Sequence, residues 1–126
     1  MRKEALNYWL QAKKDFEVAK GNQSLNEPYA AIFFCHQAVE KALKAIFIIK
    51  KQESPGSTHS LLYLAKEVHF PENLKPVLIE LSPAYITTRY PDATGELPYK
   101  IFDKTKAEYF IKFLEVFFKW AENQIK

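Results

Sequence analysis

One group of side chains that could do chemistry lies along one side of a predicted helix. His36, Glu40 and Lys44 are spaced four residues apart, so they form a single line, with Gln37 beside it. An imidazole, a carboxylate and an ammonium can move protons and can bind a charged ligand. The rest of this segment is apolar almost all round, which is typical of a buried helix. Because buried polar groups need partners, the line is either an internal network that fixes helix packing or one wall of a binding pocket.

A second group of such residues follows the end of a later predicted helix. Arg89 and Tyr90 precede Pro91 and Asp92, and Arg89 is one of only two arginines in the chain. Its planar guanidinium could grip a phosphate while Tyr90 stacks on a base. In that interpretation Arg89 shares a nucleotide-sized pocket with the line around Glu40. In the alternative, Arg89 pairs with Asp92 or with a backbone carbonyl, and Pro91 simply ends the helix.

Several kinds of active site are missing from the sequence. The adjacent Cys35 and His36 would point about 100° apart on a helix, and neither His59 nor His69 has ligand neighbours at metal-binding spacing. There is no glycine-rich phosphate loop and no nucleophile elbow. Cys35 lies in a seam of alanines, which indicates a buried and inert thiol. We therefore predict no catalytic residue, no metal and no cofactor. The candidate ligand-binding residues are His36, Gln37, Glu40, Lys44, Arg89, Tyr90 and Asp92.

Five helical segments must position these residues. Hydrophobic spacing predicts helices over about 2–20, 28–51, 73–89 and 104–126, with a short helix before Pro71. The predicted boundary signals are a stop at Gly21 and Asn22, a cap at Asn26, a cap at Ser57 or Thr58, a kink or restart at Ser82 and Pro83, and a cap at Asp103 or Thr105. Residues 91–103 show no clear period and are expected to form a long loop.

The composition indicates one all-α domain, an up-and-down bundle of four to five helices over residues 1–126. Three glycines are too few for a hairpin-rich β fold, and 126 residues make one domain. The chain has 18 Lys and Arg and 15 Asp and Glu, and the resulting net charge of +3 is too small to indicate nucleic-acid binding. The longest apolar run, 45–49, is far below the roughly 18 residues of a membrane span. We expect a cytoplasmic protein without a membrane partner.

Three stretches of the sequence together resemble a known family. They are FCHQAVEKALKA at 34–45, THSL at 58–61 and YITTRYPD at 85–92. In this order and at these distances they resemble the HEPN domain, the "higher eukaryotes and prokaryotes nucleotide-binding" family, over nearly the whole chain. The resemblance implies a small helical bundle, a homodimer and a separate small nucleotidyltransferase as partner. Such pairs often act as toxin and antitoxin.

Ribonuclease activity is common in the family that the sequence resembles, but the sequence lacks the motif for it. Many HEPN proteins are metal-independent endoribonucleases, with an arginine followed by four to six residues and then a histidine. The corresponding positions hold Thr94, Gly95 and Glu96 after Arg89, and Asn7, Tyr8 and Trp9 after Arg2. The general acid or base needed for attack by the RNA 2′-hydroxyl is therefore missing from its usual place. The sequence predicts absent or very weak ribonuclease activity.

Our first interpretation is a non-catalytic homodimer that binds a nucleotide or nucleotidyl substrate and works with a nucleotidyltransferase. The first alternative is an RNA-cleaving toxin that uses His36 or His59 as its base. The second alternative is a pure protein-interaction module. His59, near a predicted helix start, is otherwise interpreted as a capping or packing residue. The homodimer is also expected because the last helix carries two adjacent apolar seams and the first helix adds Trp9, which is more apolar surface than one bundle face needs.

Overall fold

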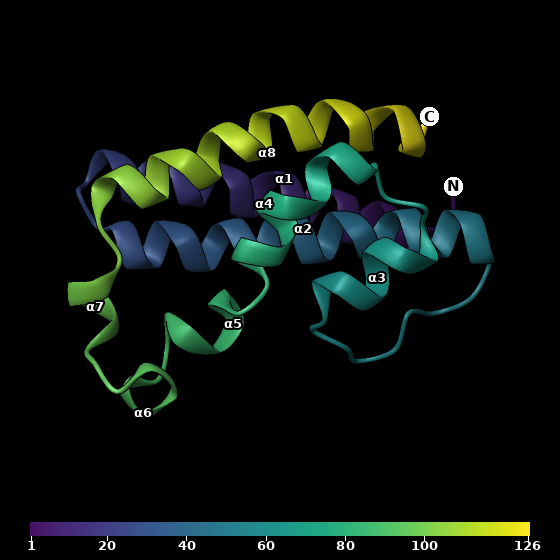
Figure 1. Ribbon diagram of the computed structural model, residues 1–126. Coiled ribbons are helices and arrows are strands. Elements are labelled where there is room, and N and C mark those ends of the chain that lie inside the picture. The colour runs from purple at the N-terminus through teal and green to yellow at the C-terminus, as the bar shows by residue number, and fades with distance from the viewer.

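Three long helices form the frame of the protein. A computed structural model describes all 126 residues. Helix α1 (Lys3–Ser24) runs antiparallel to α2 (Pro28–Lys51), and α8 (Lys104–Ile125) runs in the same direction as α2 (Figure 1). A series of short helices returns along α2 and takes the place of a fourth helix, which confirms the all-α up-and-down bundle. These short elements are α3 (Leu61–Glu67), the 3₁₀ turn η1 (Glu72–Leu74), α4 (Lys75–Leu81), α5 (Ala84–Thr87), α6 (Pro91–Thr94) and α7 (Pro98–Ile101).

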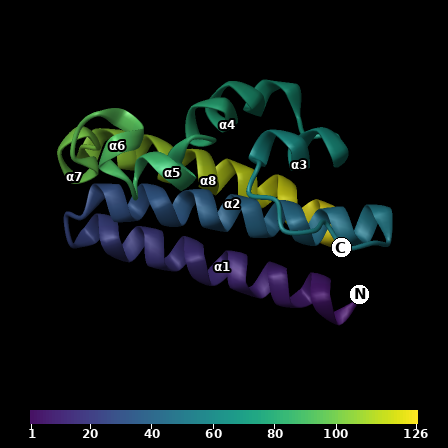
Figure 2. The same cartoon turned by 90° about the horizontal axis from the view of Figure 1, so that it is seen from below.

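Helix α2 is the centre of the bundle. It contacts α1, α8, α3, α5 and α7, and it lies between α1 and the short helices when seen from below (Figure 2). The small residues of its predicted seam are fully buried, and so are three alanines of α1. Small side chains at these positions let the backbones of the two helices approach closely. These residues are Ala31, Cys35, Ala38, Ala42 and Ala45 on α2, and Ala5, Ala12 and Ala19 on α1.

Both apolar seams of α8 pack inside the chain. Phe118 stacks on Phe16 of α1 with ring centroids 5.1 Å apart, and it lies 5.7 Å from Trp9. On the adjacent seam, Trp120 meets Phe70 edge to face at 5.3 Å. Aromatic pairs in such geometries add about 0.5–1.5 kcal/mol beyond their buried area. The large apolar surface of α8 is therefore used mostly for the bundle itself.

The first helix is longer than predicted. Helix α1 continues through Gly21 and Asn22 to Ser24, so the predicted stop is wrong. The Asn22 amide donates to the Val18 carbonyl and the Ser24 hydroxyl donates to the Lys20 carbonyl. The chain turns at Asn26, whose φ of 58° is left-handed. Asn26 is therefore not the cap of α2, although α2 begins and ends where predicted.

The predicted fourth helix is broken, as the sequence around Ser82 and Pro83 suggested. Helix α4 ends at Leu81 and α5 starts at Ala84. Residues 91–103 are not a plain loop, because they contain the one-turn helices α6 and α7. Ser60, rather than Ser57 or Thr58, caps α3 by accepting from the Tyr63 amide at 3.1 Å. Asp103 caps α8 by accepting from the Lys106 amide at 2.8 Å.

The long helices of the bundle carry charged side chains along their outer faces. None of the helices combines the necessary length with sufficient apolar character to cross a bilayer.

Candidate functional site

Glu40 is the centre of a buried polar network on α2. Its carboxylate is 4% exposed and accepts from the Lys44 ammonium at 3.2 Å. The Nδ1 atom of His59 lies 3.1 Å from one oxygen and 3.3 Å from the other. His36 Nδ1 is 4.0 Å from the carboxylate, beyond hydrogen-bond distance. The line predicted from the sequence therefore exists, and its acidic member joins α2 to the segment before α3.

His36 lies fully inside the protein. Neither ring nitrogen has a hydrogen-bond partner, and the ring centroid is 5.8 Å from that of Tyr85. Burial lowers the pKa of His36 to about 4, and the charge of His59 in its protonated form and that of Lys41 act in the same direction. A buried neutral imidazole of this kind packs against its neighbours and has no surface to offer a large ligand.

Arg89 is exposed and surrounded by aromatic rings. Its guanidinium carbon lies 5.0 Å from the ring centroid of Tyr85, 5.2 Å from that of Tyr90 and 5.6 Å from that of Phe33. Arg89 forms no ion pair and no side-chain hydrogen bond, so it does not pair with Asp92. Its five N–H donors are therefore available to a ligand.

His59 and Tyr85 connect the buried network to Arg89. The ring of His59 stacks on Tyr85, with centroids 4.1 Å apart and an interplanar angle of 15°. The side chain of His59 is 48% exposed although its Nδ1 faces the buried Glu40. We call Glu40, His59, Tyr85 and Arg89 the polar cluster. It is assembled by three separate elements: α2, the residue before the α3 cap, and α5 with the residues after it.

Two members of this cluster, His59 and Tyr85, were not among the ligand-binding residues predicted from the sequence. His59 is not the cap of α3, and Tyr85 was not singled out. Both residues belong to the short stretches that carry the family resemblance, THSL and YITTRYPD, and that was the available signal. Their contacts to Glu40 and Arg89 depend on how α3 and α5 fold back onto α2.

Two predicted ligand-binding residues lie apart from the cluster. Gln37 Oε1 accepts from Lys41, which is also ion-paired to the buried Asp15 of α1. Gln37 is therefore part of the contact between α2 and α1. Asp92 is exposed in the first turn of α6 and forms no ion pair. Tyr90, in contrast, lies directly against Arg89.

Cysteine chemistry plays no part in this region. Cys35 is fully buried, and burial raises the pKa of its thiol to about 12, so the thiolate needed for nucleophilic attack does not form at neutral pH. No three His, Cys, Asp or Glu residues come together as a group that could hold a metal ion. The inert thiol predicted from the sequence is confirmed.

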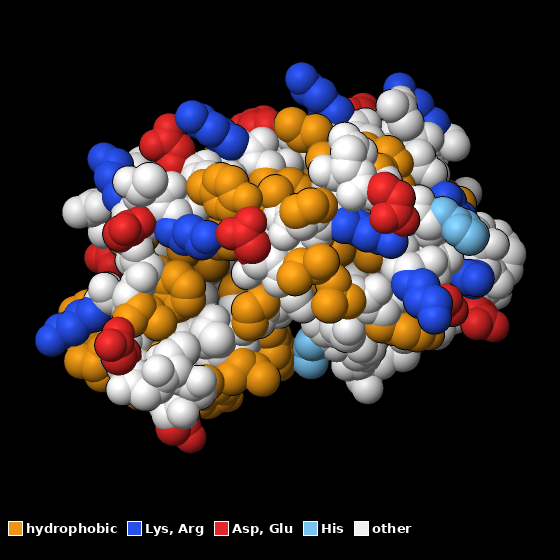
Figure 3. Space-filling view, viewed as in Figure 1, with side chains coloured by type: hydrophobic (Ala, Val, Ile, Leu, Met, Phe, Trp, Pro, Cys, Tyr) orange, Lys and Arg blue, Asp and Glu red, His pale blue; other side chains and the backbone are white.

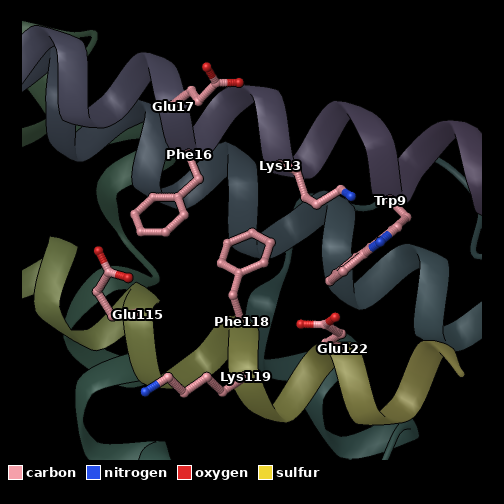
Figure 4. A pocket seen from close by; sticks show the side chains of 8 residues that line it. All are labelled: Trp9, Lys13, Phe16, Glu17, Glu115, Phe118, Lys119 and Glu122. Carbon is pink, nitrogen blue, oxygen red and sulfur yellow. The ribbon is translucent and has the colours of Figure 1, made fainter.

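A separate groove runs between α1 and α8 and has a volume of about 520 Å³. Figure 4 shows Trp9, Phe16 and Phe118 between the two helices, with charged side chains around them. Trp9 and Phe16 are buried core residues, so this aromatic stripe serves packing first. None of the residues of the polar cluster lines this groove.

The fold and sequence place the protein among small helical-bundle domains with known relatives. The HEPN domain family matches residues 5–124, and the chain belongs to this family. The crystal structure of TT1696 from Thermus thermophilus is similar with a TM-score of 0.86 and 27% identity, covering 98% of this chain and 99% of that one. The crystal structure of ST0689, an archaeal HEPN homologue, gives 0.82 and 26%, covering 99% and 100%. No curated protein matches the chain.

Proposed function

We propose that this HEPN protein is a non-catalytic homodimer that binds a nucleotide or nucleotidyl substrate and works with a separate small nucleotidyltransferase, as in a toxin–antitoxin pair. The observation that carries the binding proposal is the state of Arg89. Its guanidinium is exposed, has no acidic partner and lies against three aromatic rings. This combination suits a ligand with both a phosphate and a flat base.

The chemistry of the two ligand parts matches the two kinds of side chain. A guanidinium presents a planar fork of donors that fits two phosphate oxygens at once. Tyr90 is 46% exposed, so part of its ring is open for stacking on a base. The rings around Arg89 also restrict its side chain, which reduces the entropy lost when a phosphate binds.

The positions of two sequence features support the non-catalytic part of the proposal. No histidine occurs after Arg89 in the sequence, and His36 is completely buried. Membership of the HEPN family supports the nucleotidyltransferase partnership, because members of this family frequently pair with such proteins. Phosphate binding by Arg89 would place the transferred group where a partner enzyme can reach it, because Arg89 is exposed.

Calorimetric titration of ATP and GTP into purified protein tests the binding proposal. We expect Arg89→Ala to weaken nucleotide binding at least about tenfold, because a charge-assisted contact to phosphate is lost. The melting temperature should stay nearly unchanged, because Arg89 is exposed and buries little apolar area.

The matched control is Arg2→Ala, which removes the only other arginine, itself exposed at the start of α1. It should leave nucleotide affinity unchanged. An Arg89→Ala protein that unfolds easily but binds nucleotide normally would make Arg89 a structural residue. A wild-type protein that binds no nucleotide would favour the pure interaction module.

A second candidate function, metal-independent RNA cleavage, is favoured by the geometry of His59. The structure separates the two candidate bases, because His36 is 0% exposed while His59 is open to solvent and oriented by Glu40. Labelled RNA incubated with protein and EDTA tests this candidate. Cleavage that is lost in both His59→Ala and Arg89→Ala would overturn the non-catalytic proposal, and intact RNA would support it.

A further inference from the structure

We infer that His59 is a second ligand-contacting residue of the Arg89 site and accepts a hydrogen bond from a ribose hydroxyl. The site would then select ribonucleotides over their deoxyribose counterparts. This inference rests on the proposed nucleotide binding and adds the chemical class of the ligand. It is carried by the way that Glu40 and Tyr85 hold the imidazole of His59.

The proton position on His59 follows from its contact with Glu40. Nδ1 faces both carboxylate oxygens, at 3.1 and 3.3 Å. An ionised carboxylate only accepts hydrogen bonds, and Glu40 already accepts one from the Lys44 ammonium at 3.2 Å. Nδ1 must therefore carry the proton. In the neutral ring this leaves Nε2 without a hydrogen, as a hydrogen-bond acceptor.

The orientation of the ring leaves that acceptor for a ligand. The Nδ1 edge is held by a buried carboxylate, and one ring face is stacked on Tyr85 at 4.1 Å. The side chain is still 48% exposed, and we take the open part to include the remaining edge, which carries Nε2. A neutral acceptor of this kind binds a hydroxyl or an N–H group.

The position of His59 relative to Arg89 indicates which part of a nucleotide supplies that donor. His59 lies 4.1 Å and Arg89 5.0 Å from the same Tyr85 ring centroid, so the two are no more than about 9 Å apart, the sum of these distances. A single nucleotide is long enough to span this distance. With the phosphate on Arg89 and the base on the open face of Tyr90, the sugar is the part that remains for His59.

The test compares ATP and GTP with their 2′-deoxy and 3′-deoxy forms by calorimetry at pH 8, where an imidazole is ordinarily neutral. For wild-type protein, we expect at least one deoxy form to bind roughly 3- to 10-fold more weakly, the effect of one hydrogen bond. His59→Phe retains an aromatic ring for Tyr85 but has no acceptor. It should bind the ribonucleotide as weakly as wild type binds the deoxy form.

Two further variants keep the result interpretable. His59→Gln can place a carbonyl oxygen near the position of Nε2 and should retain part of the preference for ribose. His69→Asn changes the other exposed histidine, with a residue that tolerates its left-handed φ of 57°, and should behave like wild type. If His59→Phe is poorly folded by circular dichroism, the wild-type and Gln measurements decide the question.

The possible failures are distinguishable. The inference is wrong if wild type binds the ribonucleotide and both deoxy forms equally, or if His59→Phe keeps the preference for the ribonucleotide. In either case the proposed nucleotide binding stands. If wild type binds none of the nucleotides, the inference and the proposed function fail together.

Discussion

His36 makes the stability of the protein depend on pH. Its folded-state pKa is about 4, because burial disfavours the charged ring, whereas an unfolded histidine titrates near 6.5. As the pH falls from 6.5 to 4, the unfolded chain gains a proton that the folded protein does not bind. The free energy of unfolding should therefore fall over this range, by up to about 3 kcal/mol. Urea unfolding at successive pH values measures it.

The leucine variant of His36 isolates this contribution. His36→Leu fills a similar buried space without a titrating group, so its stability should decline less between pH 6.5 and 4. His69→Asn removes an exposed histidine and should keep the wild-type slope. Equal slopes for wild type and His36→Leu would show that other groups dominate acid unfolding.

At the level of single residues, the sequence revealed the charged candidates but not their grouping. The spacing of His36, Glu40 and Lys44 predicted one line on α2, because helical geometry alone determines it. It could not show that Glu40 meets the exposed His59. The contact between Glu40 and His59, 19 residues later, depends on how the chain before α3 folds back onto α2.

For the helices, local sequence patterns predicted the long segments, whereas tertiary contacts determine where some of them end. The period of apolar residues predicted α2 and most of α1 and α8, because a long buried face leaves a strong pattern. Helix ends were less predictable. Gly21 was interpreted as a stop, but the Gln23 side chain donates to the Lys104 carbonyl at the start of α8, a tertiary contact that supports the last turn of α1. The one-turn helices α6 and α7 are too short to show a period.

Gly21 and Gly95 should respond in opposite ways to the same substitution. Gly21 lies in the last part of α1 with open space around its Cβ position and no positive φ. Gly21→Ala should stabilise the protein by about 0.5–1 kcal/mol, because alanine loses less entropy in a helix. Gly95 ends α6 with a φ of 76°, which favours glycine. Gly95→Ala should therefore destabilise the protein by about 1 kcal/mol. Thermal unfolding of both variants checks this, and a lower melting temperature for Gly21→Ala would contradict it.

For the whole molecule, the structure offers a second chain an apolar surface other than the one that the sequence suggested. Phe118 and Trp120 of α8 are partly buried against the core of their own chain. Hydrophobic side chains instead gather on the face formed by the short helices, among α4, α5 and α7 (Figure 3). Outside the proposed nucleotide site, the exposed large apolar residues of these elements and their connections are Ile79, Ile86, Leu97 and Tyr99.

This short-helix face leads us to predict where the homodimer forms. Ile86 is 51% and Tyr99 60% exposed, and such residues contribute most when a partner covers them. Sedimentation at micromolar concentration should show twice the 14.7 kDa mass of the chain. Ile86→Lys combined with Tyr99→Glu should shift the protein to the monomer, because two charges would be desolvated in each half of a symmetric interface.

Leu10→Lys is the matched control for this prediction. Leu10 is also 51% exposed, but it lies on α1, away from the short helices. We expect this variant to stay dimeric, with the circular dichroism of the wild type. If Leu10→Lys dissociates the protein and the double variant does not, the interface includes α1, the helix that carries Trp9. A wild-type protein that sediments only as a monomer would contradict the predicted homodimer.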